Sequence, residues 1–375
     1  MKITRVHARA LHIEFPIGVL GITDTQSMNC VFTEVETDDG HIGYGFSAIT
    51  NVEVVATAIN KVAGPAILGD DPVATERVWD KLYWLLCPRG QGGHGMHAIA
   101  AIDVALWDIK GKALGLPLWR LLGGARKKVP VYATFGFGFF DRDQLGDAAK
   151  HWIGLGFDKI KMTVGMNALA RRDEPRPLED AIRADVARVQ AVREAAGPDV
   201  GIYIDANCSL DPLHAIKLAK QLEPLDIAFF EEPINQNDIR PMVDMRRQTS
   251  IPLACGQNEG QAHRFRDLMI HGAVDVIQPN VVISGGYTQC IKVAGMAQAF
   301  NVTIDNGGAW PFHNMHLHGG VANGGLVECH FLSIESCKRI FKSLPEQENG
   351  WLTLPETPGV GLEPDLNAVH DLEIH

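Results

Sequence analysis

The sequence lacks several features that mark special classes of protein. Its seven cysteines are scattered and odd in number, and without a CxxC pair they indicate neither a disulfide framework nor a cysteine zinc site. No run of about 18 apolar residues is present, so no membrane span is expected. The opening stretch MKITRVHARALHIEF has no signal-peptide core. We therefore expect a cytoplasmic protein with reduced thiols.

Positive charge is also scarce. The 34 lysines and arginines are outnumbered by 45 aspartates and glutamates, and the net charge of −11 argues against a nucleic-acid partner. A small anionic substrate is still compatible with this charge, because a bound metal and a few local cations reverse the field at a site. Hydrophobic residues make up 46% of the 375 residues, which is enough for a large core and about two domains.

Residues 1–125 have the pattern of an α+β domain. Strand-like alternation surrounds the hairpin signal Asp38-Asp39-Gly40, and three helical patterns follow, the last of which ends at Gly115 and Pro117. The Pro/Gly-rich tail, about 346–375, is expected to fold back onto this domain and complete it.

From Val129 onward, predicted strands alternate with helical patterns. The strands end in polar or ionisable residues at steps of 44, 26, 26, 23, 25 and 23: Lys161, Asp205, Glu231, Gln257, Asn280, Asp305 and Glu328. β/α repeats of this length close into a barrel, and sites in such barrels lie at the carboxyl ends of the strands. We therefore predict an α/β fold in which residues 126–345 form a TIM-like barrel.

The long first step contains a polar insertion with Arg171, Arg172 and Arg176. It is interpreted either as a solvated surface excursion or as a lid that meets an anionic substrate.

Acids at the ends of two buried strands point to a metal. Asp205 follows the apolar run Ile202-Tyr203-Ile204, and Glu231 follows Ile227-Ala228-Phe229-Phe230. Both runs are typical of parallel strands that are covered by helices on both faces, where an acid has no packing role. Carboxylate oxygens are suitable ligands for hard divalent cations, so we predict that these acids bind one.

The motifs Lys159-Ile160-Lys161, Asp205-Ala206-Asn207, Phe230-Glu231-Glu232-Pro233 and Gly256-Gln257-Asn258 together resemble the enolase superfamily, closest to its mandelate racemase/muconate lactonizing branch. The resemblance covers nearly the whole chain. It implies an α+β capping domain on a modified (β/α)7β barrel, with Mg²⁺ at the ends of the third, fourth and fifth strands. It also implies abstraction of the proton α to a carboxylate, through an enediolate.

The resemblance implies that Asp205 and Glu231 bind the metal. The family usually has an acid at the third ligand position, where this chain has Gln257; Glu259 is the alternative if the strand is shifted. Lys161 is implied as the base, and Lys159 as a contact of the substrate carboxylate. Because both lysines face the same side of a strand, we expect each to lower the pKa of the other.

The second acid or base is less clear from the sequence. Asn280 stands where the family has a lysine or an aspartate on the sixth strand, which leaves Asp305, His313 and His316 as candidates for an acid or a substrate contact. The resemblance implies that Glu328 is the eighth-strand acid that hydrogen-bonds the intermediate. The remaining expected substrate contacts are Asn207, Asn280 and Trp310.

With only one clear base, β-elimination is the first hypothesis, namely dehydration of a hydroxy acid or sugar acid. Racemisation, epimerisation or cycloisomerisation of a carboxylate is the alternative. A non-catalytic binding protein is a lesser one, since a binder does not need both lysines. The expected partners are Mg²⁺ and a small carboxylate, and the resemblance implies a homo-oligomer.

Overall fold

The computed structural model describes residues 1–49, 51–165 and 178–374, and its N-terminal part is an antiparallel sheet packed against helices. Strands β1 (Ile3–Pro16), β2 (Thr25–Thr37) and β3 (Ile42–Ala48) pair in sequence order. The helices that follow are α1 (Val52–Ala58), α2 (Gly64–Ile67), α3 (Thr75–Gly90), α4 (His94–Leu114) and α5 (Leu118–Leu121). The predicted α+β character of this part is confirmed.

Helix α4 lies directly on strand β3. The helix is apolar on nearly all sides between Ala98 and Ile109, as expected of a helix buried in a core. Gly43 and Gly45 allow the close approach, since a β-carbon would stand 2.1 Å from the Ala105 carbonyl oxygen in one case and 1.8 Å from that of Ala101 in the other.

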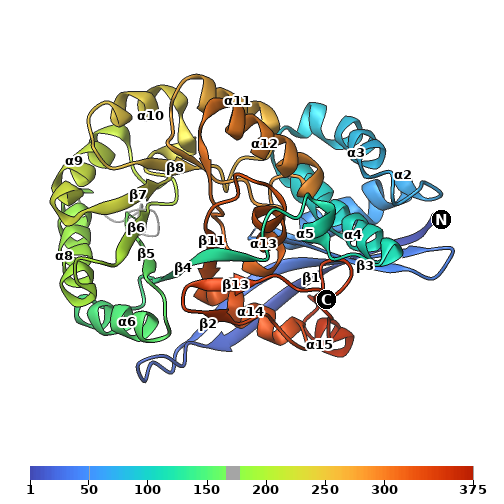
Figure 1. The fold of residues 1–375 in the computed structure, drawn as a ribbon, viewed down its shortest axis with the longest axis horizontal. Helices are drawn as coiled ribbons and strands as arrows, with labels where there is room; N and C mark the ends of the chain where they lie inside the picture. The colour runs from blue at the N-terminus through green and yellow to red at the C-terminus, as the bar shows by residue number, and fades with distance from the viewer. Residues whose placement is uncertain (50, 166–177, 375) are drawn as a thin grey trace.

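The second part is a parallel β/α barrel (Figure 1). Its strands are β4 (Lys128–Gly136), β5 (Lys159–Thr163), β6 (Gly201–Asp205), β7 (Ile227–Glu231), β8 (Leu253–Cys255), β9 (Val276–Ile277), β10 (Thr303–Ile304) and β11 (Val327–His330). They pair in sequence order, and β11 closes the ring on β4. A bridge between Ile304 and Gly324 joins β10 to the segment that leads into β11. The predicted barrel is confirmed.

Helices cover the outside of the barrel, as Figure 1 shows for its green to orange segments. They are α6 (Arg142–Gly154), α8 (Leu178–Ala196), α9 (Pro212–Leu222), α10 (Ile239–Arg246), α11 (Ala262–Ile270), α12 (Gly286–Phe300), α13 (Pro311–Gly320) and α14 (Phe331–Ile340). Inside, Tyr132, Tyr203, Phe229 and Ala254 form an apolar layer. In the described ranges, no helix is long and apolar enough to cross a bilayer. The insertion with Arg171, Arg172 and Arg176 lies outside the described residues.

The C-terminal tail contacts both parts. Strands β12 (Gln347–Glu348) and β13 (Trp351–Thr353) form a hairpin that extends β4 on its amino-terminal side. Helix α15 (Leu366–Asp371) returns to β1, where the His12 backbone N–H donates to the Leu372 carbonyl at 3.0 Å. The tail therefore touches the N-terminal sheet, while its hairpin belongs to the barrel sheet; that the tail completes the N-terminal domain stays a prediction.

The N-terminal domain is docked on the segment that leads into α12. The Asp103 carboxylate accepts hydrogen bonds from the backbone N–H and the hydroxyl of Thr288, at 3.0 and 2.5 Å. Trp107 donates to the same hydroxyl, and Ser47 donates to the Val282 carbonyl. Burial raises the pKa of Asp103 to about 7, against the opposing effect of the Thr288 hydrogen bonds. This interface therefore contains a carboxyl group that is neutral in mild acid.

Asp103→Asn tests this protonation. Because the folded-state pKa lies above the unfolded value of about 3.9, the wild type loses stability as pH rises from about 4 towards 7. The variant should match the wild type near pH 4 and exceed its unfolding free energy by about 1–4 kcal/mol at pH 8 in urea titrations. Asp80→Asn, at an exposed position of α3, is the control. A pH-independent difference between Asp103→Asn and the wild type would contradict the assignment.

Candidate active site

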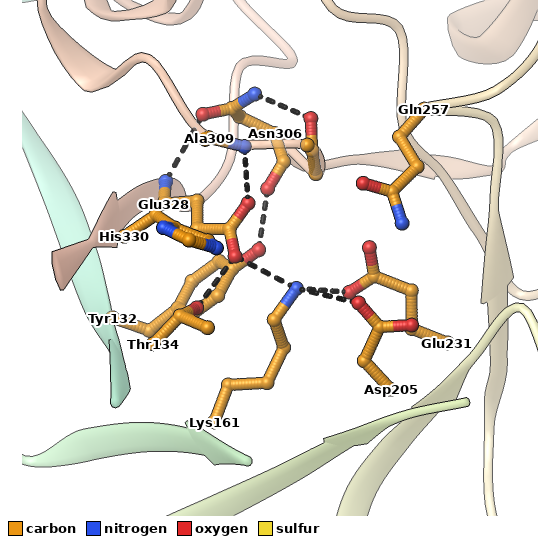
Figure 2. Close-up of polar contacts among 12 residues, drawn as sticks. Tyr132, Thr134, Lys161, Asp205, Glu231, Gln257, Asn306, Ala309, Glu328 and His330 are labelled. Atoms are coloured by element: carbon orange, nitrogen blue, oxygen red, sulfur yellow. Dashed lines mark hydrogen bonds and ion pairs between the residues drawn. The ribbon is translucent and has the colours of Figure 1, made fainter. Parts of the chain in front are cut away.

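The Lys161 ammonium lies among three carboxylates at the barrel mouth (Figure 2). Its Nζ is 2.5 Å from Glu231 Oε2, 2.9 Å from Glu328 Oε1 and 3.5 Å from Asp205 Oδ2. The lysine side chain is only 1% exposed, and all three acids are buried. A buried charge is stable only when it is paired, so this cluster is held together by its own charges.

Local backbone geometry fixes the positions of the Asp205 and Glu231 carboxylates. The backbone of Asn207 is left-handed (φ 48°), and its N–H donates to Asp205 Oδ1 at 2.7 Å. The DAN motif is therefore a turn that fixes the carboxylate, a conformation that asparagine tolerates well. The exposed Asn207 contributes its main chain, and a substrate contact through its side chain stays a prediction. Glu232 is also left-handed (φ 42°) and turns the chain away directly after Glu231.

Glu232 fixes the direction of the Gln257 amide. Gln257 Nε2 donates to Glu232 Oε2 at 2.9 Å. Because a carboxylate only accepts hydrogen bonds, the amide nitrogen faces Glu232 and the oxygen is left for another partner. Figure 2 shows the Gln257 amide directed towards Glu231. The alternative ligand, Glu259, is instead paired with Arg264 at 2.9 Å. The geometry favours Gln257 over Glu259 as the third ligand.

The residues present fit a magnesium ion. Glu231 Oε1 is buried and has no hydrogen-bond partner among the described residues. Burial raises the pKa of the Asp205 and Glu231 carboxyls, which means that these groups gain by sharing a further cation. No group of three His, Cys, Asp or Glu suited to a metal occurs in the described ranges. Two carboxylates and one amide oxygen do not form such a group, because glutamine is not among those residue types. Three oxygen ligands of this kind suit a hard cation.

The loop after β10 closes over these oxygens. A β-carbon at Gly307 would stand 2.6 Å from Glu231 Oε1, and one at Gly308 would stand 2.9 Å from Gln257 Oε1. The next residue, Ala309, donates its backbone N–H to Glu328 Oε2 at 2.6 Å. Glu328 also accepts from the Thr134 hydroxyl at 2.5 Å. Glu328 is thus fixed beside Lys161, as the predicted eighth-strand acid should be.

The prediction for Lys159 is wrong. It lies at the amino end of β5, opposite Gly201, while Thr163 at the carboxyl end is the residue level with Asp205. Its side chain is 29% exposed and pairs with Asp158 at 2.8 Å. The two lysines share a face of the strand but not a height in the barrel, so Lys159 does not depress the pKa of Lys161.

The pKa of Lys161 is raised, and not lowered as predicted. Burial alone would lower it, but the carboxylates of Glu231, Glu328 and Asp205 together outweigh burial. In this protein the ammonium form of Lys161 is the counter-ion of the cluster.

Asn280 is fully occupied with the loop after β10. Its Nδ2 donates to the carbonyl oxygens of Gly307 and Gly308 at 2.7 and 3.0 Å, and its Oδ1 accepts from Asn314 and from the Val282 backbone N–H. The prediction that Asn280 contacts substrate is therefore corrected: this side chain positions the Gly307–Ala309 backbone.

The histidines of HNMHLH lie within the packed helix α13. The His313 ring stacks on Phe46 with centroids 5.1 Å apart, and burial lowers its pKa to about 3. His316 Nε2 lies 2.9 Å from the Val360 carbonyl in the tail, and burial lowers its pKa to about 4. Both rings are buried and face the packed interior, so the predicted acid and substrate roles are not supported by these contacts.

Trp310 and Asp305 are the remaining predicted residues. Trp310 is fully buried and packs on Phe46 with centroids 4.6 Å apart, so it acts as a core residue behind the loop. Asp305 Oδ1 accepts from the Leu326 backbone N–H at 2.7 Å, and burial raises its pKa to about 6. This carboxyl helps to join β10 to β11, and its role as an acid stays a prediction.

His330 is a neighbour of the cluster that sequence reasoning missed. It follows Glu328 by two residues on β11, so both side chains face the same side, and Figure 2 shows the ring beside that carboxylate. Burial lowers the pKa of His330 to about 4, and its Nδ1 accepts from the Ser333 backbone N–H. A neutral imidazole of this kind carries its proton on Nε2. The period-two spacing from Glu328 was the available signal.

Comparisons with known proteins agree with this geometry. Residues 2–123 match the N-terminal domain of mandelate racemase/muconate lactonizing enzymes, and residues 144–369 match the enolase C-terminal domain-like family. The chain is 32% identical to the arabinonate dehydratase of Saccharolobus solfataricus over 352 residues, which cover 92% of this chain and 90% of the relative. It is 30% identical to the 3,6-anhydro-α-L-galactonate cycloisomerase of Streptomyces coelicolor over 382 residues, which cover 99% of both.

Solved structures show the same likeness. The structure of L-talarate dehydratase from Polaromonas, in complex with magnesium and L-glucarate, superposes with a TM-score of 0.85 at 30% identity. The match covers 100% of this chain and 98% of that one. That relative therefore binds magnesium together with a small polyhydroxy carboxylate.

Gln257→Leu tests the third ligand. Removing the amide oxygen should weaken Mg²⁺ binding about 10–100-fold in titration calorimetry, because the remaining site has two protein oxygens. Glu259→Gln is the matched control and should leave the metal affinity within about twofold, since Glu259 is paired with Arg264. The opposite order of effects would make Glu259 the ligand.

Gly307→Ala tests the close approach of the loop. A methyl group 2.6 Å from Glu231 Oε1 must displace the loop or the carboxylate, so Mg²⁺ affinity should fall by about tenfold or more. Gly295→Ala in helix α12 is the control, because its added methyl has no neighbour within 4 Å. Helix propensity predicts a gain of about 0.5–1 kcal/mol in stability there. Unchanged metal binding in Gly307→Ala would contradict the geometry.

Proposed function

Because this chain belongs to the mandelate racemase/muconate lactonizing enzyme family of the enolase superfamily, we propose that it is a magnesium-dependent dehydratase of a hydroxylated carboxylic acid, a sugar acid in particular. The observation that carries the proposal is the buried cluster of Lys161 with Asp205, Glu231 and Glu328. In this cluster, a lysine that can carry a proton lies beside carboxylates that favour a bound cation.

The division of labour follows from the contacts. Asp205, Glu231 and Gln257 would hold a magnesium ion, which would supply positive charge to stabilise the substrate carboxylate as its α-proton is removed. Asp205 and Glu231, once shared with that cation, hold the Lys161 ammonium less strongly, which frees the amine to accept the proton. Glu328, fixed by Thr134 and Ala309, stays beside Lys161 and hydrogen-bonds the oxygen on which charge develops.

Dehydration needs fewer groups than the alternatives. Lys161 removes the α-proton and returns it to the departing β-hydroxyl on the same face, so that water leaves and the enol product becomes a 2-keto acid. Racemisation requires a second acid or base on the opposite face. Asn280, on the strand where the family supplies such a group, is an amide committed to the loop backbone. The arabinonate and L-talarate dehydratases among the relatives also favour elimination.

Isomerisation is the second candidate. The likeness to a cycloisomerase over 99% of the chain favours it, and Asp305 is the described carboxyl that such a reaction could use. The two candidates differ in the fate of the substrate: dehydration gives a keto acid lighter than the substrate by one water molecule, whereas isomerisation conserves the substrate mass, which mass spectrometry of the product distinguishes.

Lys161→Met tests the proposed base. The variant keeps side-chain volume but lacks the amine, so α-deuterium exchange of a turned-over acid in D₂O with Mg²⁺ should fall by about 10³-fold or more. Lys159→Met is the matched control and should retain wild-type exchange, because Lys159 pairs with Asp158 outside the cluster. Circular dichroism checks that both variants are folded. Full exchange in Lys161→Met would refute the assignment, and no turnover by wild type across a broad acid library would refute the proposed function.

A further inference from the structure

One buried amide differs from the others in this protein. The fully or nearly buried Asn and Gln side chains of the described ranges are Asn237, Gln257, Gln278, Asn280, Gln289, Asn306 and Asn314. All but Gln278 hydrogen-bond to other residues. Both Nε2 and Oε1 of Gln278 are buried without a partner in the described part of the chain. An unsatisfied buried polar group is costly and rare in native proteins, and such groups concentrate at functional sites.

Gln278 directly follows β9, at the carboxyl end of that strand. Its backbone N–H donates to the Cys255 carbonyl at 2.9 Å, so the main chain is fixed. Counting from β5, β9 is the fourth strand in one direction (β6, β7, β8, β9) and also in the other (β4, β11, β10, β9). The strand that carries Gln278 is thus the one directly across the barrel from the strand that carries Lys161.

The side chain of Gln278 ends near the Glu231 carboxylate, on the other side of Gly307. The position that a Gly307 β-carbon would take is 2.8 Å from Gln278 Nε2 and 2.6 Å from Glu231 Oε1. The free amide and the free carboxylate oxygen therefore border the same small space beneath the loop. Because residue 307 is a glycine, it has no side chain that would fill this space.

We propose that Gln278 is a specificity-determining residue that binds a hydroxyl group of the substrate on the face opposite Lys161. The inference rests on the proposed function and adds the class of substrate: an acid with a hydroxyl group on that face. A hydroxyl both donates and accepts hydrogen bonds, so it satisfies an amide that offers N–H and C=O together. An amide neither takes nor supplies a proton in this chemistry, so it recognises the far face without reacting there.

Recognition of this kind predicts a particular pattern of stability and selectivity. Because the Gln278 amide has no partner among the described residues, Gln278→Leu should leave the thermal midpoint unchanged or raise it. Gln289→Leu is the matched control. Gln289 donates to the carbonyls of Gly260 and Ser284, at 2.6 and 2.7 Å, so its loss should lower the midpoint by ~2 °C or more.

The selectivity test uses α-deuterium exchange in D₂O with Mg²⁺, on an acid that the wild type exchanges and on its deoxy analogues. Wild type should prefer the fully hydroxylated acid, and Gln278→Leu should lose about 10–100-fold of that preference while it still exchanges one deoxy analogue. Gln289→Leu should keep the preference. Binding of the same acids to the Mg²⁺-loaded proteins, measured by calorimetry, should follow the same order.

The outcomes separate the two proposals. If the wild type exchanges the acid and Gln278→Leu keeps the full hydroxyl preference, the Gln278 inference is wrong and the proposed function stands. If the wild type exchanges no acid at all, the proposed function fails. Thermal stability gives an independent test. If Gln278→Leu loses as much stability as Gln289→Leu, the inference is overturned. Such a loss would mean that a structural water satisfies the Gln278 amide in the free protein.

Discussion

The barrel mouth depends on one balance of charge: a buried ammonium against three buried carboxylates. Lys161 compensates Asp205, Glu231 and Glu328 at distances of 2.5 to 3.5 Å. In an environment of low dielectric, removing either sign leaves the other uncompensated at high cost. The same balance explains why the site fits a divalent cation, since the acids outnumber the base and one Glu231 oxygen has no partner in the described part of the chain. The same buried charges therefore stabilise the metal-free fold and favour metal binding.

Much of this arrangement could be predicted from the sequence, because strand ends carry a periodic signal. The acids Asp205 and Glu231 end apolar strands, and the barrel fold followed from their spacing. Lys159 shows where that reasoning stops. Period-two alternation assigns a residue to a face of the strand, but only the register with β6 tells how far along the barrel it lies. The register depends on pairing between distant segments, which the local pattern of one strand does not contain.

Contacts between residues far apart in the sequence determine which of the other predicted residues lie at the site. The family position of Asn280 predicts a substrate contact. Its amide instead donates hydrogen bonds to carbonyl groups 27 and 28 residues further along the chain. The histidines of helix α13 had suitable chemistry, but packing against Phe46 and the C-terminal tail withdraws them from the mouth. No sequence pattern marks Gln278, because what distinguishes it is an amide without partners among the described residues, which only the folded structure shows.

The contact between Asp103 and Thr288 limits how this protein can exchange parts with its relatives. Asp103 caps the start of α12 from the other domain, and a β-carbon at Gly286 would stand 2.2 Å from its carboxylate. Thr288 lies eight residues after Asn280, whose amide in turn hydrogen-bonds the loop over the proposed metal ligands. A capping domain transplanted from another family member must therefore bring a matching short acid, and the recipient barrel must keep its glycine. The two domains are linked physically through the segment that joins Asn280 to Thr288, beside the loop that covers the site.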